Sequence, residues 1–358
     1  MWHTEEGSTG RLMQLCFFYF FFYVLTGVTA KYFTSGVPGL PHLSQIEYLT
    51  YNTIGGVAIA LSIALALRWY KIKSNQLIPI GKIKIPIELL YIIPSGICTA
   101  VVIPTTTIMY LLPIPVMVAM VIMRGSIIIV SRLIDAIQIK QGILKKKVYW
   151  EEECAVIFAV LAISVDIFFS HDASGFEFIH SPAAMAILSS YIVAYFIRIY
   201  IMNYYKNTRG KGVPQDNKGF FALEQICATT VILLVSIILF INPEHSTLDA
   251  VIQYHKALTA PTSHWPWEIV AGTAFGAVSF FSVFLFMFKG RTATFTGLVN
   301  RLTSLVAGTL ATLIFCFIWG GKYPSFTEWL SLAAILIAVM FLSKAEKKRV
   351  VELKLKNS

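Results

Sequence analysis

Two arginines lie inside long apolar stretches of this chain, where a charge is costly unless it has a partner or a function. Arg124 stands near the middle of the apolar run from Pro113 to Ile139, and Arg301 stands in a second run from Thr294 to Trp319. Each run is long enough to cross a bilayer, which takes ~20 residues as a helix. A guanidinium binds carboxylate or phosphate through two parallel hydrogen bonds. The two arginines therefore predict an anion-binding site inside a membrane.

The sequence around the first arginine resembles the sequence around the second. VIMRGS at 121–126 is similar to VNRLTS at 299–304, and a shift of 177 residues (301 − 124), close to half of the 358, places Arg124 on Arg301. The same shift places Ser126 on Thr303. A charged residue that recurs at matching depth in both halves predicts a pseudo-symmetric transporter with a central site.

The composition assigns the chain to the polytopic membrane proteins. Hydrophobic residues make up 56% of the sequence, and the mean hydropathy is +0.70, well above an ordinary soluble domain. The net charge of +10 comes from 29 basic and 19 acidic residues, and the basic ones lie mostly between apolar runs. That placement follows the positive-inside rule and argues against nucleic-acid binding.

The residues that could carry other chemistry give no pattern of a catalytic or metal site. The five cysteines lack CxxC spacing, and six of the seven histidines lie in or beside predicted outer loops without ligand spacing. We therefore expect no enzyme activity, no metal and no cofactor.

The fold class predicted is an all-α polytopic membrane protein. Ten transmembrane helices are expected, at about residues 13–30, 48–69, 87–112, 113–139, 153–170, 183–204, 220–241, 267–288, 294–319 and 326–343. We expect a loop over 243–266 and a basic tail after 343. Basic residues alternate between loops so that both termini are predicted to be cytoplasmic. Five helices per half make the halves, 1–178 and 179–358, inverted repeats.

Polar side chains at helical spacing extend the candidate site beyond the two arginines. The predicted substrate-binding residues are Arg124, Arg301, Ser126, Asn300, Ser304, Thr106, Tyr23, Tyr191, Tyr195 and Lys31. Structural alternatives stay open for several of them. The arginines could bind carbonyl groups freed by Pro94 or Pro104, the tyrosines could pack in the bundle, and Lys31 could extend its amine to the membrane surface. Arg198 and Glu224 are interpreted as a structural ion pair.

The ten short-looped helices resemble the drug/metabolite transporter superfamily, including its EamA-like and nucleotide-sugar transporter branches of the solute-carrier type. In layout the resemblance covers essentially the whole chain. In detail it depends on TGVTAKYFTSGVPGLPHLSQ at 26–45 and on MRGSIII at 123–129. It implies alternating access through a central cavity lined by the first, third, fourth, sixth, eighth and ninth helices. The lysine-rich ninth-helix signature of some nucleotide-sugar transporters is absent, which leaves the substrate undecided.

The predicted function is secondary transport of a small organic anion, such as a phosphorylated or nucleotide-linked metabolite. The alternatives are an exporter of neutral or amphipathic metabolites and a membrane receptor or scaffold that transports nothing. The expected partners are a small-molecule substrate and the lipid bilayer, and a homodimer is left open. The expected location is a multi-pass integral membrane protein, in either a plasma or inner membrane or an endomembrane.

Overall fold

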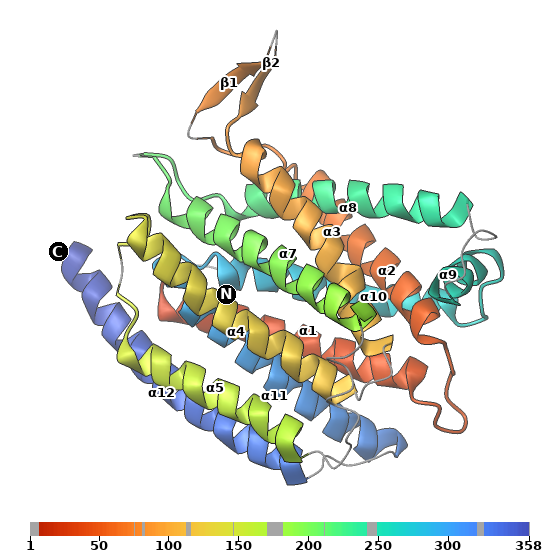
Figure 1. Cartoon of the computed structure of the whole chain (residues 1–358). Helices are drawn as coiled ribbons and strands as arrows, with labels where there is room; N and C mark the ends of the chain where they lie inside the picture. The colour runs from red at the N-terminus through yellow and green to blue at the C-terminus, as the bar shows by residue number, and fades with distance from the viewer. Residues whose placement is uncertain are drawn as a thin grey trace.

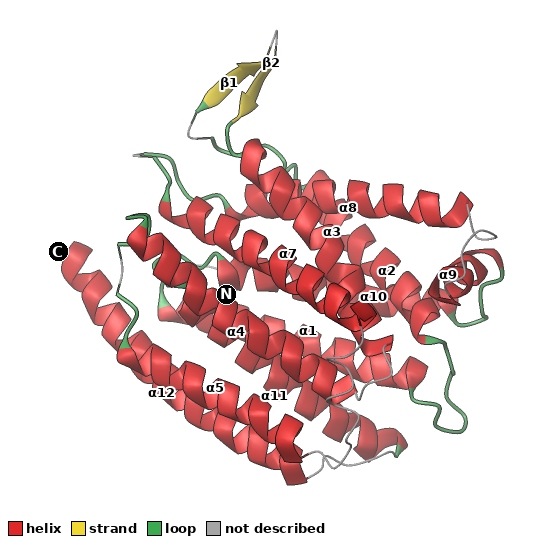
Figure 2. Cartoon of the chain, viewed as in Figure 1, coloured by secondary structure: helices red, strands yellow, loops and turns green. Residues whose placement is uncertain are grey.

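The computed structural model describes residues 7–74, 76–80, 83–111, 116–145, 147–169, 182–210, 212–241, 249–320 and 326–357. These residues are almost entirely helical, and the long helices lie alongside one another in one bundle (Figures 1 and 2). The prediction of an all-α chain is confirmed.

The long helices follow the apolar runs closely. They are α1 (Thr9–Thr34), α2 (Gln45–Ala66), α3 (Leu89–Leu111), α4 (Val116–Lys140), α5 (Trp150–Phe169), α7 (Pro182–Asn207), α8 (Asn217–Ile241), α10 (Trp265–Phe286), α11 (Ala293–Trp319) and α12 (Phe326–Asn357). Among the described residues, eight of them are long and apolar enough to cross a membrane: α1, α2, α3, α7, α8, α10, α11 and α12. The chain is therefore a multi-pass membrane protein by length and composition. Helices α4 and α5 pack against members of this group, α4 on α7 and α11, and α5 on α12.

Three elements differ from the sequence-based expectation. A two-stranded antiparallel hairpin, β1 (Leu77–Ile80) and β2 (Ile83–Pro86), projects from the bundle between α2 and α3 (Figure 1). The predicted loop over 243–266 contains the short helix α9 (Asp249–Thr259). The predicted basic tail after 343 is part of a helix, because α12 continues to Asn357. Buried charges on that extension, among them Arg349, are paired with other helices, which keeps it helical.

Local capping sets where several helices begin and end. Ser44 and Glu47 form a reciprocal capping box at the start of α2, with O···N distances of 3.2 and 3.0 Å. The Thr292 hydroxyl accepts from the backbone N–H of Phe295 at the start of α11. That helix stops at Gly320, whose φ of 81° suits glycine because it has no Cβ.

Helix α3 contains Pro94 and Pro104, as the sequence required. A proline inside a helix frees a carbonyl group, and nearby hydroxyls can satisfy the affected turn. The hydroxyls of Thr105 and Thr106 donate to the carbonyl oxygens of Val101 and Val102, at 2.7 and 2.6 Å. Both are the bonds to the carbonyl four residues back that threonine commonly makes inside a helix, and the carbonyl group that Pro104 frees is a different one, that of Ala100.

Helices α2 and α10 meet along a seam of glycines. A Cβ on Gly272 would lie 2.4 Å from the carbonyl oxygen of Asn52, and one on Gly276 would lie 2.4 Å from that of Gly56. Real Cβ atoms do not approach a backbone oxygen that closely, so only glycine fits here. The Gly272-x-x-x-Gly276 pattern, typical of closely packed membrane helices, thus lies against Gly55 and Gly56.

Four helices carry most of the binding residues predicted from the sequence. Helix α1 packs on α10 and α11, and α4 packs on α7 and α11. Helices α1, α4, α7 and α11 carry all but one of the predicted binding residues; Thr106 lies on α3.

Candidate functional site

Arg124 is buried on α4, with 4% of its surface exposed. Its Nη2 donates a hydrogen bond of 2.9 Å to the hydroxyl of Tyr23 on α1, and its Cζ lies 5.5 Å from the centre of the same ring. The contact joins residues that are far apart in the sequence, and both were predicted site residues. The predicted fourth helix and the predicted first helix therefore meet at this arginine.

Arg301 is buried on α11, with 8% of its surface exposed. Its Cζ lies 4.9 Å from the ring centre of Tyr195 on α7, and the two side chains are within hydrogen-bonding reach. The Tyr195 ring packs edge-on against Tyr191, with 4.8 Å between ring centres. The Nε and Nη2 atoms of Arg301 are buried and have no hydrogen-bond partner among the described residues. This guanidinium thus keeps two inward donors available for a ligand.

Tyr19 links the two arginines. It is 2% exposed on α1, one turn before Tyr23, and lies within electrostatic range of both Arg124 and Arg301. Its hydroxyl donates to Oδ1 of Asn300 at 3.4 Å, and Asn300 in turn donates to the Ser282 hydroxyl at 2.9 Å. Tyr19 is not among the binding residues predicted from the sequence, although its spacing of four residues from Tyr23 places both on one face of the helix. The two arginines and the four tyrosines 19, 23, 191 and 195 are called the central cluster below.

The remaining predicted residues take other places. The Ser304 hydroxyl bonds to the carbonyl oxygen of Arg301 within α11, and the Thr106 hydroxyl bonds to Val102 within α3. Ser126 is half-buried on α4, two residues beyond Arg124. Lys31 is in the last turn of α1, about 12 Å along the helix from Tyr23 at 1.5 Å per residue. Lys31 is therefore not part of the central cluster.

A third buried arginine lies near the cluster and has its own counter-charge. Arg198 on α7 pairs with Glu224 on α8 through two bonds of 2.9 Å, and Ser95 donates to the same carboxylate at 2.6 Å. The interpretation of Arg198 and Glu224 as an ion pair is confirmed. No ion pair involves Arg124 or Arg301 within the part of the chain that the structure describes.

Asp135, the acidic residue of α4, is held at one end of the bundle. Its carboxylate accepts from the backbone N–H groups of Ala293 and Thr294, at 2.8 and 2.6 Å. Those groups form the first turn of α11, whose dipole favours a negative charge. Asp135 therefore does not neutralise either arginine of the central cluster. Asp166 of α5 has a side chain outside the described residues.

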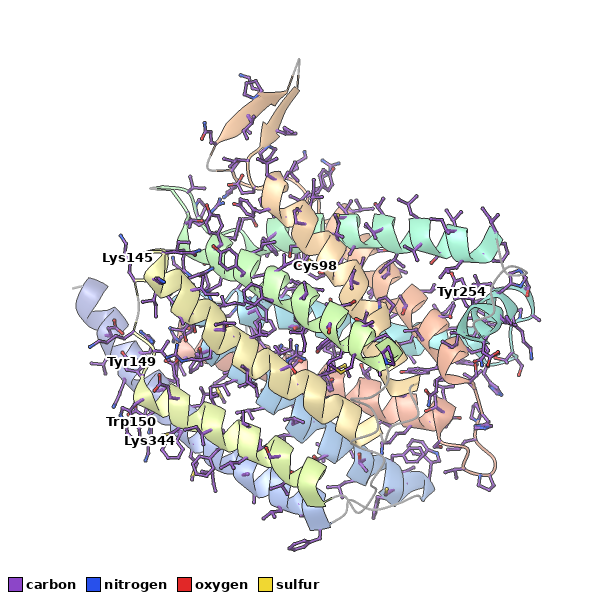
Figure 3. All side chains as sticks on the ribbon, viewed as in Figure 1. Cys98, Lys145, Tyr149, Trp150, Tyr254 and Lys344 are labelled. Carbon is purple, nitrogen blue, oxygen red and sulfur yellow. The ribbon has the colours of Figure 1, made fainter. Side chains whose placement is uncertain are left out.

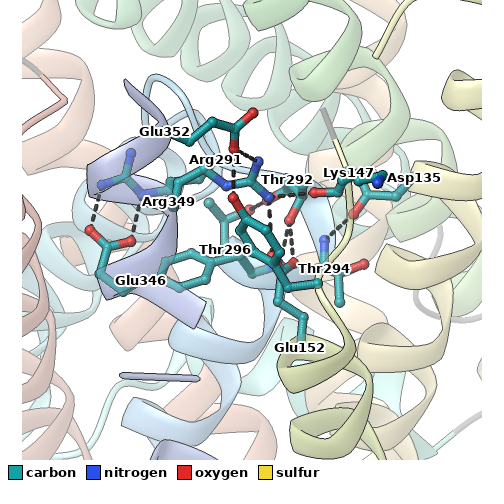
Figure 4. Close-up of polar contacts among 12 residues, drawn as sticks. Asp135, Lys147, Glu152, Arg291, Thr292, Thr294, Thr296, Glu346, Arg349 and Glu352 are labelled. Carbon is teal, nitrogen blue, oxygen red and sulfur yellow. Dashed lines mark hydrogen bonds and ion pairs between the residues drawn. The ribbon is translucent and has the colours of Figure 1, made fainter. Parts of the chain in front are cut away.

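Charged residues close the same end of the bundle (Figure 4). Arg291 pairs with Glu346, while Arg349 pairs with Glu152 at 3.2 Å and with Glu352 at 2.9 Å. Thr292 also donates to Glu152 at 2.7 Å. The network ties α5, α12 and the start of α11 together. Lys145, Tyr149 and Lys344 lie at this end, whereas Tyr254 on α9 lies at the opposite end (Figure 3).

Tyr149 belongs to that closed end and stays protonated. Its hydroxyl donates to Glu352 at 2.6 Å. Burial, together with that carboxylate, raises the pKa of Tyr149 to about 12. The hydroxyl is therefore a stable donor at neutral pH and not a proton-transfer group.

Metal-binding geometry is not seen in the described residues, where no three His, Cys, Asp or Glu side chains gather. The cysteines are all free thiols. What the central cluster offers chemically is positive charge and aromatic surface, which suits non-covalent binding of an anion.

No protein-family model and no curated protein sequence matches the chain. A solved crystal structure matches it in fold, with a TM-score of 0.57 and 14% sequence identity. The match covers 94% of this chain and 98% of the other. The whole helical arrangement therefore occurs in another protein of similar length.

Proposed function

We propose that this chain is a secondary transporter that moves a small organic anion by alternating access. In this proposal ten helices cross the membrane as two inverted five-helix repeats, 1–178 and 179–358, and both termini face the cytoplasm. The substrate binds at the central cluster between α1, α4, α7 and α11.

The packing of the helices supports two related halves. Advancing each long helix by five pairs α1 with α7, α2 with α8, α3 with α10, α4 with α11 and α5 with α12. If each helix is replaced by its counterpart in the other half, the contact between α1 and α10 corresponds to the contact between α7 and α3. The contact between α1 and α11 corresponds in the same way to the contact between α7 and α4. The contact of α2 with α10 becomes that of α8 with α3, while α4 with α11 and α5 with α12 map onto themselves. All of these contacts occur.

The start of α1 contacts the last part of α12, which places the two on the same side of the bundle, as an even number of crossings requires. The hydroxyl of Thr9, at the start of α1, donates to Glu346 in the last part of α12 at 3.0 Å. The connections predicted to be cytoplasmic carry most of the loop lysines and arginines. These observations favour ten crossings with both termini inside.

The single observation that carries the proposed substrate class is Arg301. Its guanidinium is buried, and among the described residues its Nε and Nη2 have no hydrogen-bond partner. The second arginine of the cluster likewise has no acidic partner among the residues that the structure describes. Burying a charge that no opposite charge compensates reduces the stability of the protein by roughly several kcal/mol, because the ion loses its hydration. An anionic substrate would supply the missing charge. The tyrosine rings around it would contact the uncharged part of that molecule.

A ligand-stabilisation screen of the purified protein tests this function. Anionic, zwitterionic and cationic metabolites are compared by the rise in unfolding temperature that each causes. We expect anions carrying carboxylate or phosphate to stabilise the wild type and to lose that effect in Arg301→Gln. Arg132→Gln is the matched control, since Arg132 is partly exposed and pairs with Glu153 at the surface.

Two other outcomes of the screen would overturn the proposal. Stabilisation only by neutral or amphipathic compounds would indicate an exporter of such metabolites. Stabilisation by no small molecule at all would indicate a receptor or scaffold.

A further inference from the structure

Glu268 is a buried carboxyl group without a partner. It lies in the first turn of α10, its side chain is 0% exposed, and neither carboxylate oxygen has a hydrogen-bond partner among the described residues. Nothing in the sequence patterns had singled it out, because an acidic residue at the start of a helix is ordinary.

The backbones next to Glu268 are closely packed. One turn further along, Gly272 packs its Cα side directly on the backbone of Asn52, and a Cβ on Gly55 would lie 2.0 Å from the carbonyl oxygen of Ile269. The backbones of α2 and α10 therefore touch on this seam. A side chain at its start has little room for solvent.

The neighbours of Glu268 on the other helices bring no positive charge. Its charged neighbour is Glu47 of α2, and two tyrosines of α2, Tyr48 and Tyr51, also lie in electrostatic range. From α1 the nearest contribution is Thr29, which bonds to Tyr48 and does not titrate. No charged side chain of α1, α8 or α11 within the described part of the chain joins this group.

The other buried acidic residues of the bundle differ from Glu268. Glu224 pairs with Arg198 at 2.9 Å, Glu88 with Arg209 at 2.7 Å, and Glu152 with Arg349 at 3.2 Å. Asp135 accepts from two backbone N–H groups. The fold thus compensates these carboxylates with a cation or with N–H donors, and Glu268 has neither.

A carboxylate in that position would be costly, since an isolated ion inside a protein loses several kcal/mol of hydration. A hard cation is usually bound by several carboxylates, and no three His, Cys, Asp or Glu side chains gather among the described residues. We propose that Glu268 is an exchangeable-proton site: it is a neutral carboxylic acid while α2 and α10 are closed at this end, and it releases its proton when they separate. The O–H bond breaks, the proton passes to water, and the electron pair stays on the carboxylate.

The inference rests on the proposed function in one respect, because it makes transport proton-coupled. Separation of α2 from α10 would expose Glu268 to the compartment on that side, predicted to be the outer one. Both experiments below need no substrate. Their failure would therefore remove the proton site without deciding whether the chain transports an anion.

Infrared spectroscopy of the full-length protein, with isotope-labelled glutamate, tests the protonation. We expect the carbonyl stretch of a protonated carboxylic acid at neutral pH in the wild type, its loss in Glu268→Gln, and its retention in Glu47→Gln. Adding sodium or calcium should leave the band unchanged. A band that persists in Glu268→Gln, or that disappears on adding a cation, would overturn the proposal.

A distance measurement tests the coupling to helix movement. Spin labels at Ile54 on α2 and Val270 on α10, both exposed, report the gap between the helices once the native cysteines are replaced. Going from mildly acidic to mildly alkaline pH should lengthen the distance in the wild-type background and leave it unchanged in Glu268→Gln. The same pH response in both backgrounds, or none in either, would contradict the proposed role.

Discussion

Arg198 and Glu224 form a two-point ion pair inside the bundle, with Nε–Oε1 and Nη2–Oε2 distances that are both 2.9 Å. Arg198 also lies within electrostatic range of Arg301. The pair uses the carboxylate of α8 completely and leaves none for the central cluster. Among the described residues, the three arginines on α4, α7 and α11 thus have one acidic partner, Glu224, and it pairs with Arg198.

Removing the carboxylate of that pair should destabilise the protein strongly. Glu224→Gln leaves Arg198 buried and uncompensated, for which a loss of about 3–5 kcal/mol is expected. Thermal unfolding in detergent measures the effect. Glu153→Gln is the control, because the Arg132–Glu153 pair has side chains 34% and 51% exposed and should contribute about 0–1 kcal/mol. Equal losses of stability in the two variants would contradict the conclusion that the buried Arg198–Glu224 pair contributes more than the surface pair.

Both arginines of the central cluster should be needed for binding of the proposed anionic substrate. A charge-assisted hydrogen bond contributes roughly 1.5–3 kcal/mol, so Arg124→Ala and Arg301→Ala should each weaken affinity by about 10- to 150-fold. Arg→Lys should recover little, since an ammonium group cannot replace the planar fork. Affinity and unfolding temperature are measured on the same samples. Normal affinity in both well-folded alanine variants would end the anion-site hypothesis.

The glycine seam should not tolerate a methyl group. In Gly272→Ala the new Cβ would lie 2.4 Å from the Asn52 carbonyl oxygen, so a loss of about 1–3 kcal/mol is expected as the helices move apart. Gly308→Ala on α11 is the matched control. Nothing lies within 4 Å of a Cβ there, and alanine should stabilise that helix by roughly 0.5–1 kcal/mol. Unfolding temperatures of the two variants that move in the same direction would argue against the close seam.

The proposed topology can be tested with a reporter that is active only in the cytoplasm. Fused after Lys147, between α4 and α5, the reporter should be active; fused after His255, within α9, it should be silent. The reason is the excess of basic residues in the connection that contains Lys147. Activity at His255, or silence at Lys147, would show that the number or direction of the crossings differs.

Much of the helical layout could be predicted from the sequence, because each membrane helix satisfies its backbone hydrogen bonds internally and needs only a long apolar run. The membrane span predicted at 294–319 corresponds to α11, which runs from Ala293 to Trp319. The span predicted at 220–241 ends at the same residue as α8, Ile241. The elements that were missed lie outside such runs. Helix α9 and the hairpin of β1 and β2 are short, and the extension of α12 is polar. Tertiary contacts such as that of Arg349 with Glu152 stabilise the extension, and hydropathy does not register them.

The sequence by itself also determined that two particular charges are buried. Arg124 and Arg301 had to lie in a protein interior because they stand in apolar runs, and both are buried. Only the tertiary structure decided what surrounds them. Tyr23, which is 101 residues away from Arg124 in the sequence, accepts a hydrogen bond from it. Asp135 instead accepts a hydrogen bond from the N-terminus of α11. Glu268 shows the same limit, since its lack of a partner follows from how α2 and α10 pack. Spacing along one helix places a side chain on a face, but which groups meet that face depends on helices distant in sequence.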